Sequence, residues 1–209
     1  MQRRIACESH SMIKHRRTSR IIAVSFAVGL GAAAYWLLTT SRAMTRTPRY
    51  KLLLKDGNFE LRDYPPLTVV NASMGGVGMD SSFRKLFGYI TGGNESSEKI
   101  AMTTPVLIGA AGGERTMGFI MPDNVSAQGV PKPSDPSLSL GQLNPGRFAV
   151  IRFNGEHSSA NEARAVETLT HWLTTRNLVA QGAPVIAYYD PPWTPVFLRR
   201  NEVMIPAQP

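Results

Sequence analysis

The segment Lys99-Ile-Ala-Met-Thr-Thr-Pro-Val106 lies in the middle of this 209-residue chain, and Tyr189-Asp-Pro-Pro-Trp-Thr-Pro195 lies near its end. Either segment alone is weak evidence for a fold, because proline-rich turns are common. Four more segments accompany them, and a set of six in one order over most of a domain is hard to obtain by chance. The four are Leu61-Arg-Asp-Tyr-Pro-Pro66, Phe83-Arg-Lys-Leu-Phe-Gly-Tyr-Ile90, Arg147-Phe-Ala-Val-Ile-Arg-Phe153 and Arg199-Arg-Asn-Glu-Val203.

Together these segments resemble the SOUL family of heme-binding proteins, and the resemblance covers roughly residues 50 to 206. It implies an α+β fold in which about eight strands form a twisted antiparallel β-barrel, with two helices packed outside it. It also implies a ligand-binding protein rather than an enzyme.

The pattern of apolar residues predicts the elements of the first half. Asp-Gly within Lys55-Asp-Gly-Asn58 separates two β-rich runs and is a strong hairpin signal. Apolar residues at i, i+3, i+4 and i+7 predict a helix over 81–90, which Gly92-Gly93 ends. The expected strands of the whole chain are 50–54, 59–64, 67–73, 100–108, 116–121, 147–153, 184–189 and 195–205.

The second half repeats the order of the first. A strand over 147–153 precedes a helix over about 159–176, and two strands follow. The order strand, helix, strand, strand thus occurs twice, which predicts two similar modules in one sheet system. The proline-rich segment 122–145 contains no predicted element, and a loop of that length is usually functional or mobile. The second helix is expected to bury Ala163, Val166, Leu169, Thr170 and Leu173.

The positive charge is confined to the amino-terminal part of the chain. A formal net charge of +8 would suggest nucleic acid or a membrane surface as partner if it were spread evenly. Residues 1–50 hold nine Lys and Arg against one acid, whereas the remainder holds fourteen basic and fourteen acidic side chains. The folded part is therefore formally neutral, and a nucleic-acid partner is not expected.

Residues 21–41 contain no charged side chain and are long and apolar enough for a transmembrane helix. Six basic residues precede this segment and three follow it, which places the amino terminus in the cytoplasm and the domain in a periplasmic or otherwise non-cytoplasmic space. The predicted organisation is a basic cytoplasmic tail (1–20), a transmembrane signal-anchor helix (21–41), a linker (42–49) and a SOUL-like domain (50–209).

Three alternatives to a retained anchor remain open. A cleavable signal peptide is supported by small residues at Ser41-Arg-Ala43, and a transit peptide by the Arg-rich start. A buried helix of a soluble domain is the third. The single cysteine, Cys7, precedes the apolar segment, so the domain forms no internal disulfide and depends on core packing.

The resemblance implies a shallow tetrapyrrole site between the first helix and the loop near Tyr189-Asp-Pro-Pro192. Arg84 or Lys85 could pair with a heme propionate. Some family members carry a basic residue in the turn after this motif, where this chain has Trp193-Thr194. The alternative for the apolar helix residues is packing on the sheet. The candidate cofactor-binding residues are Phe83, Arg84, Lys85, Leu86, Phe87, Trp193 and Thr194.

Two histidines lie in the domain, and both are candidate heme ligands. His157 follows a strand in a turn-like setting, and His171 lies on the second helix, pointing away from its apolar face. Neither has the spacing of a metal site. Both also suit a surface position without a ligand.

The domain contains no motif for nucleophilic catalysis or nucleotide binding, which disfavours an enzyme. Glu202 is the acid of interest, because in the wider barrel superfamily an inward acid in a comparable place can meet a cationic ligand. Its alternative is a salt bridge with Arg199 or Arg200 at the barrel rim.

The sequence therefore predicts a membrane-anchored protein that binds heme or a related tetrapyrrole reversibly as a carrier, buffer or sensor. Two alternatives stay open for the same barrel. One is binding of other amphipathic or cationic small molecules, and the other is a hydrolase or tetrapyrrole-modifying activity.

Overall fold

The computed structural model describes residues 45–208, apart from 77 and 112–113. These residues belong to one compact unit, Thr45–Pro209. The predicted span at 21–41 lies outside the described residues. Within the described part, no helix combines the length and the apolar character that crossing a bilayer requires.

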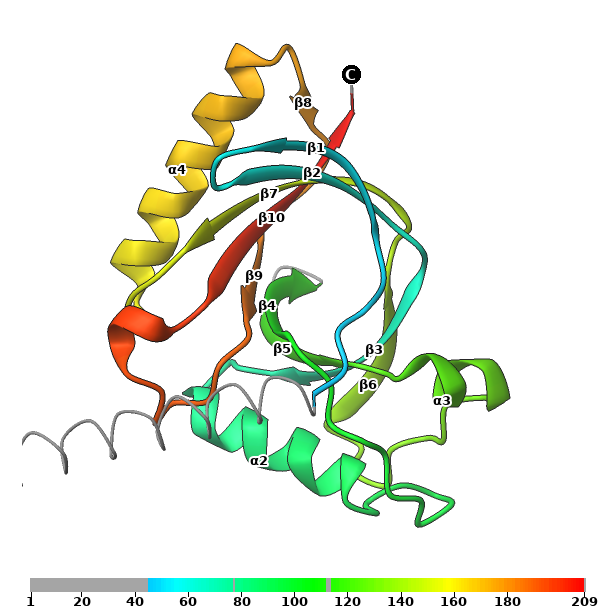
Figure 1. The fold of residues 1–209 in the computed structure, drawn as a ribbon. Helices are drawn as coiled ribbons and strands as arrows, with labels where there is room; N and C mark the ends of the chain where they lie inside the picture. Colours follow the sequence, from blue (N-terminus) through cyan, green and yellow to red (C-terminus); the bar gives the residue numbers. More distant parts are fainter. Residues whose placement is uncertain (1–44, 77, 112–113, 209) are drawn as a thin grey trace, which may run out of the picture. The chain divides into compact units, whose positions relative to one another are not determined.

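One antiparallel sheet of ten strands forms the centre of the domain (Figure 1). Its order is β1-β2-β7-β10-β9-β4-β5-β3-β6, and β8 pairs with β10 beside this path. The sheet curls but does not close, because β1 and β6 each have one neighbour. The strands are β1 (Lys51–Asp56), β2 (Phe59–Tyr64), β3 (Leu67–Ser73), β4 (Val106–Ala111), β5 (Glu114–Ile120), β6 (Leu138–Leu143), β7 (Gly146–Phe153), β8 (Val179–Ala180), β9 (Val185–Tyr188) and β10 (Asn201–Gln208).

Three helices accompany the sheet in the described residues: α2 (Gly78–Ile90), α3 (Asp123–Gln128) and α4 (Ser159–Thr175), with a short 3-10 turn η1 (Val196–Leu198). The α+β class and the antiparallel sheet are confirmed, whereas the expected barrel of about eight strands with two helices is corrected to an open sheet of ten strands with three helices in the described residues. The segment 122–145, predicted to lack elements, holds α3 and β6. Both are short, and α3 buries only Val125, so neither produces a readable periodicity.

The two halves share one connectivity. In the first half β3 leads through α2 to the β4–β5 hairpin, and β5 returns beside β3. In the second half β7 leads through α4 to β9 and β10, and β10 returns beside β7. The halves meet where β4 pairs with β9. The strand that precedes each half pairs with the other half, since β2 lies beside β7 and β6 beside β3.

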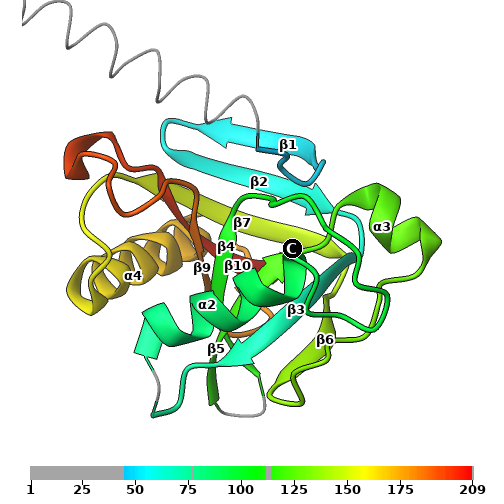
Figure 2. The same ribbon diagram turned by 90° about the horizontal axis from the view of Figure 1, so that it is seen from below.

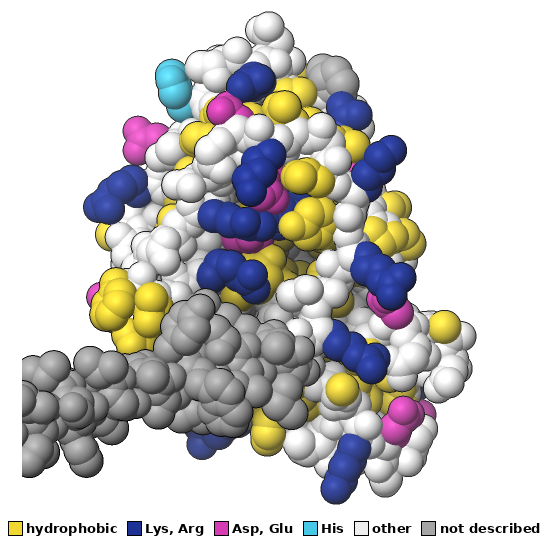
Figure 3. Space-filling model, viewed as in Figure 1, with side chains coloured by type: hydrophobic (Ala, Val, Ile, Leu, Met, Phe, Trp, Pro, Cys, Tyr) yellow, Lys and Arg dark blue, Asp and Glu magenta, His cyan; other side chains and the backbone are white. Residues whose placement is uncertain are grey.

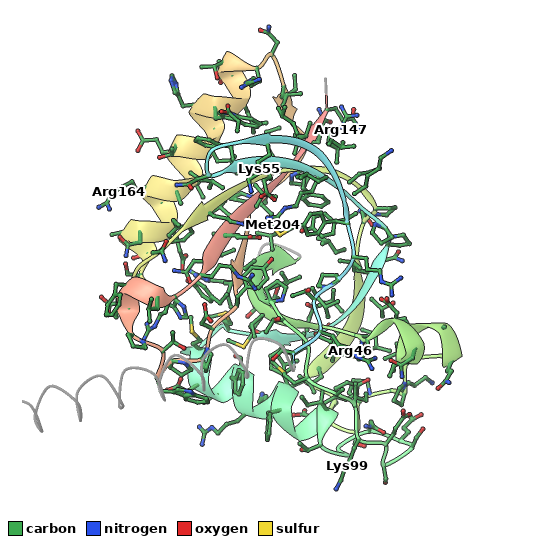
Figure 4. The ribbon with its side chains drawn as sticks, in the orientation of Figure 1. Arg46, Lys55, Lys99, Arg147, Arg164 and Met204 are labelled. Carbon is green, nitrogen blue, oxygen red and sulfur yellow. The ribbon has the colours of Figure 1, made fainter. Side chains whose placement is uncertain are left out.

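Side chains alternate between two faces of the curled sheet. The outer face carries the larger apolar cluster, which α2 covers over β3 and β5 and which α4 covers over β7 and β10 (Figure 2). The inner face carries a smaller apolar cluster that includes Val69, Phe148 and Met204. Figure 4 places Met204 near the middle of the curled sheet.

Helix α4 buries a face that differs in part from the predicted one. Leu169 and Leu173 are buried as expected, whereas Ala163 and Thr170 are exposed. Trp172 determines this rotation, because its ring stacks on Phe59 with centroids 5.2 Å apart and its Nε1 donates to Asp56 at 3.0 Å. The remaining buried residue is Ala165.

Two predicted strands begin later than expected. The run 100–108 is a strand only from Val106, because Ile100 is buried beside the end of α2 and donates its amide to the Ile90 carbonyl at 2.8 Å. The run 195–205 begins as η1, and pairing starts at Asn201.

Replacement of Leu169 by Ala is expected to destabilise the domain by about 2 to 5 kcal/mol, because it leaves a cavity under α4 where the side chain is fully buried. Urea unfolding followed by circular dichroism measures the change. His171→Ala, two residues away on the exposed side of α4, is the matched control and should alter stability little. Equal effects of the two substitutions would contradict this packing of α4.

Candidate functional site

The first helix of the proposed site is held on the sheet by its buried side. The Ser82 hydroxyl donates to the carbonyls of Ser73 and Gly78 at 2.8 and 3.0 Å. Tyr89 is buried and donates its hydroxyl to the Pro131 carbonyl at 2.8 Å, and burial raises its pKa to about 12. These contacts orient α2, so that its opposite side faces outward.

That outward side carries an aromatic pair. Phe83 and Phe87 are 38% and 49% exposed, and their rings lie nearly parallel with centroids 6.1 Å apart. Phe83 also meets the Phe119 ring edge to face at 5.3 Å. Leu86, in contrast, is completely buried and offers no surface to a ligand. Of the apolar candidates on α2, the two phenylalanines are therefore the accessible ones.

Among the described residues, the side-chain hydrogen bonds of the two cations on α2 go to hydroxyl groups, and the charge of Lys85 also acts on Asp135. Lys85 Nζ donates to Ser137 Oγ at 3.0 Å, and this hydroxyl donates to Asp135 at 2.7 Å. An Arg84 guanidinium nitrogen lies 3.3 Å from Ser81 Oγ. A neutral hydroxyl is a weaker partner for a cation than a carboxylate, so a ligand carboxylate could replace either contact.

The loop between β9 and β10 is closed by its own polar groups. Asp190 accepts the Arg200 amide at 2.6 Å, and the Arg199 guanidinium donates to the carbonyls of Thr194 and Pro192 at 2.8 and 2.5 Å. Trp193 projects from this loop and is 82% exposed. No hydrogen bond or ring contact in the described residues joins Trp193 to α2. Thr194 is buried, and its hydroxyl has no hydrogen-bond partner in this part of the chain.

The histidines have different surroundings. His157 stacks on Tyr188 with ring centroids 3.7 Å apart, and its Nε2 is buried without a hydrogen-bond partner among the described residues. Burial, followed by the charge of Arg199, lowers the His157 pKa, so the imidazole is neutral near pH 7. Tyr188 in turn donates its hydroxyl to Glu162. His171 is exposed on α4, as the helix periodicity predicts.

Glu202 lies on the inner face, in a buried ion network. Arg62 binds both of its carboxylate oxygens, at 2.7 and 2.9 Å, and Arg152 Nε donates to it at 2.9 Å. Tyr189 donates its hydroxyl to the same carboxylate at 2.8 Å. The partners are therefore not Arg199 or Arg200, which the sequence offered as neighbours. Arg199 turns into its own loop, and Arg200 lies over the Tyr189 ring at 3.7 Å.

The network extends to a second acid and two tyrosines. Arg62 Nε donates to Glu60 at 2.7 Å, and Arg152 lies 3.3 Å from the same residue. Arg62 also donates to Tyr64 at 3.0 Å and lies over the Tyr50 ring at 4.4 Å. Sequence reasoning missed this cluster. Its signal is the alternation of Glu60 and Arg62 in one strand, which places both on the same face.

These contacts determine the charge of Glu202. Burial alone would raise the pKa of its carboxyl group, but the hydrogen bonds and charge of Arg62, with those of Tyr189 and Arg152, outweigh burial and hold the pKa below its ordinary value. The carboxylate is ionised and already has four donors. It has little capacity left for a cationic ligand.

Basic side chains gather on the face shown in Figure 3, where Lys and Arg outnumber Asp and Glu. Figure 4 labels three of the basic residues of the domain, namely Arg46 before β1, Lys55 in β1 and Arg147 in β7. A separate open pocket of about 660 Å³ lies between α4 and the strands β4 and β9. Its ionised groups include Arg115 and Glu162, which pair at 2.8 Å.

Comparison with solved structures shows which proteins share this fold. The EcmrR C-terminal domain aligns with a TM-score of 0.51 and 12% identity, over 76% of this chain and 98% of that one. A hydrolase from Listeria innocua aligns with a TM-score of 0.51 and 13% identity, over 74% and 94%. At these identities the likeness concerns the fold alone.

Sequence comparison gives the family. No curated protein sequence matches the chain. The family described as SOUL heme-binding protein matches residues 45–206, which include every strand and helix described above except the last two residues of β10. The match thus covers both helix-containing halves, the aromatic pair on α2 and the loop that carries Trp193. The chain belongs to the SOUL heme-binding protein family.

Proposed function

We propose that this protein binds heme or a related tetrapyrrole reversibly, as a carrier, buffer or sensor. Membership in a heme-binding family supports a tetrapyrrole as ligand. The exposed pair Phe83 and Phe87 is the observation that carries the proposal, because a flat apolar macrocycle needs an accessible aromatic surface.

Arg84 and Lys85 lie between the two phenylalanines in the sequence of α2, and we propose that these cations meet the propionates at the edges of the ligand. Trp193 offers a second exposed aromatic ring from the β9–β10 loop. Leu86 and Thr194 are buried, so we propose that they support this surface without contacting the ligand, Leu86 in the core under α2 and Thr194 in the β9–β10 loop. Heme would thus be held by apolar contact and by charged hydrogen bonds.

An axial ligand is not required for this mode of binding. His157 presents its Nε2 to the protein interior, and His171 lies on α4, the helix of the other half. We therefore propose binding without a histidine ligand to the iron.

Replacement of both Phe83 and Phe87 by Ser is expected to weaken hemin binding by at least about tenfold, because it removes apolar contact worth about 1.5 to 3 kcal/mol. Lys85→Ala should weaken binding by about 1 to 3 kcal/mol through loss of a charged hydrogen bond. A visible-absorption titration that follows the Soret band measures both effects.

Two controls accompany this titration. Val179→Ser changes an exposed apolar residue on β8 and should leave hemin affinity unchanged. The double variant His157→Ala/His171→Ala should keep the Soret shift. Saturable binding that survives the loss of both phenylalanines would refute the proposed surface, and loss of binding in the histidine variant would establish an axial ligand.

A barrel that binds cationic molecules through Glu202 is disfavoured by the ion network. Arg62, Arg152 and Tyr189 already occupy this carboxylate. The same occupancy argues against Glu202 as a catalytic acid or base, and we propose a binding role rather than an enzymatic one.

Glu202→Gln is expected to cost about 3 to 5 kcal/mol of folding stability at pH 7, because it leaves the buried Arg62 and the half-buried Arg152 with Glu60 as their one remaining counter-charge in the network. In the wild type, the pKa of Glu202 in the folded state lies below its ordinary value of 4.5. The carboxylate therefore contributes its full stabilisation of the fold above pH 4.5, and this stabilisation is lost as the pH falls through the folded-state pKa. Urea unfolding of wild type and variant between pH 7 and pH 3 should show the stability gap shrinking in acid.

Glu95→Gln, an exposed acid outside the network, is the control and should show no gap at any pH. Titration of the wild type with organic cations should show no saturation. Saturable cation binding that Glu202→Gln abolishes would instead favour the cation-binding alternative.

We also propose that residues 21–41 are retained as a membrane anchor and that the domain lies outside the cytoplasm. The support is the uncharged apolar run and the excess of basic residues before it. Amino-terminal sequencing of protein from fractionated cells should find residues 1–43 intact and in the membrane fraction. A soluble protein that begins near Met44 would show cleavage and overturn the anchor.

A further inference from the structure

The β9–β10 loop exposes a cluster of large apolar side chains that the domain does not use for packing. Trp193 and Phe197 are 82% and 74% exposed, and Val196 and Leu198 are 45% and 40% exposed. We refer to these four residues as the apolar tip. Figure 3 shows hydrophobic side chains gathered over η1, at the lower left of the domain. Scattered exposed residues are ordinary, but four within six positions are a patch.

The loop is built to present this tip outward. Its backbone is braced by the Arg199 guanidinium, which donates to two loop carbonyls, and by the Asn154 side chain, which donates to the Phe197 carbonyl at 3.2 Å. The Leu198 amide donates to the Pro195 carbonyl at 2.8 Å, closing the turn of η1. Polar groups thus face the domain while the apolar side chains face away from it.

The apolar tip lies at the end of the sheet where the amino-terminal segment joins the domain. The Thr104 amide donates to the Arg46 carbonyl at 2.9 Å, which fixes the incoming chain just before β4. Val106, the first residue of β4, pairs with Tyr188, the last residue of β9. The loop that follows Tyr188 therefore starts from the same end of the sheet.

This placement brings the loop within reach of a bilayer that holds residues 21–41. Four residues lie between Ser41 and Arg46, and an extended chain over these five steps spans at most about 20 Å. An anchor at 21–41 would thus keep this end of the sheet near the membrane.

The charge of the loop suits an anionic lipid surface. Arg199 and Arg200 follow the tip directly, and the single acid of the loop, Asp190, is buried. Trp is enriched at the membrane–water boundary because its ring is apolar and its N–H is polar. Phe197 and Leu198 supply the purely apolar contact beside it.

We propose that the apolar tip enters the headgroup region of a lipid bilayer and orients the domain on the membrane. The occupant of the patch is therefore lipid, and a second copy of the chain is an alternative that the test below separates. Lipid is a partner beyond the tetrapyrrole, and Trp193 is the one residue that the tip shares with the proposed tetrapyrrole surface. It uses the predicted anchor only to bring the loop near the bilayer.

The test is quenching of Trp193 fluorescence by brominated lipid in the full-length protein without heme. The chain has three tryptophans, so Trp36→Phe removes the one in the predicted span and leaves Trp172 and Trp193. Trp172 is buried against Phe59 and serves as an internal reference. The protein is reconstituted in vesicles of phosphatidylcholine and phosphatidylserine, with and without bromine on the upper part of the acyl chains.

Bromine is expected to quench the Trp193 emission and to leave the Trp172 emission unchanged. The additional change Trp193→Ser should abolish the quenchable component, and Phe197→Ser should reduce it. Phe83→Ser/Phe87→Ser, which alters exposed aromatics elsewhere on the domain, is the matched control and should preserve it.

Three results would overturn the proposal. The first is equal Trp193 emission in brominated and ordinary vesicles. The second is a blue shift that depends on the ratio of protein to lipid without bromine quenching, which would assign the tip to self-association. The third is loss of quenching in the α2 variant, which would assign the membrane contact to that helix. None of these results depends on hemin. The hemin titration therefore tests tetrapyrrole binding separately from membrane contact.

Discussion

The bidentate contact of Arg62 with Glu202 is the constraint on which the rest of the domain depends. The two residues belong to β2 and β10, which are not neighbours, because β7 lies between them. Arg152 on β7 joins the same carboxylate, so one ion network ties three strands together. An unpaired charge at this depth would be strongly destabilising, and a slip of one residue would move each of these side chains to the opposite face. The network therefore selects one register and ties β2, which precedes the first half, to the second half.

This network also determines where a ligand can bind. The inner face of the curled sheet is filled by Met204 and its apolar neighbours on one side and by paired charges on the other. An interior acid with four donors is a structural element rather than a receptor for a cation. The EcmrR C-terminal domain and a hydrolase from Listeria innocua share this fold, so the fold itself is compatible with several functions. The tetrapyrrole site that we propose instead uses side chains outside the sheet.

Two segments on the exterior carry those side chains, and hydrogen bonds to the rest of the domain hold the backbone of both. Helix α2 is fixed by Ser82 and Tyr89, which leaves Phe83 and Phe87 at the surface. The β9–β10 loop is braced by polar contacts to its own backbone, which leaves the apolar tip outward. In each case polar contacts hold the backbone, so the aromatic rings keep a defined position although they are largely exposed. Surfaces of this kind are common at sites that bind ligands or membranes.

The sequence by itself determined the family, both long helices, most strands and the repeated order of the two halves, because apolar periodicity and turn residues are local signals. It also placed His171 at the surface and separated the basic tail from a neutral domain. It missed α3 and β6, whose six residues each are too short for a periodic pattern. It placed the buried side of α4 correctly at Leu169 and Leu173 but not at Ala163 and Thr170, because Trp172 packs on Phe59 from a distant strand. Only the tertiary structure decided the partners of Glu202, the burial of Leu86 and Thr194 and the exposure of Trp193. Each of these depends on side chains that are far apart in the sequence, and pairing and burial between such residues exist only once the sheet has formed.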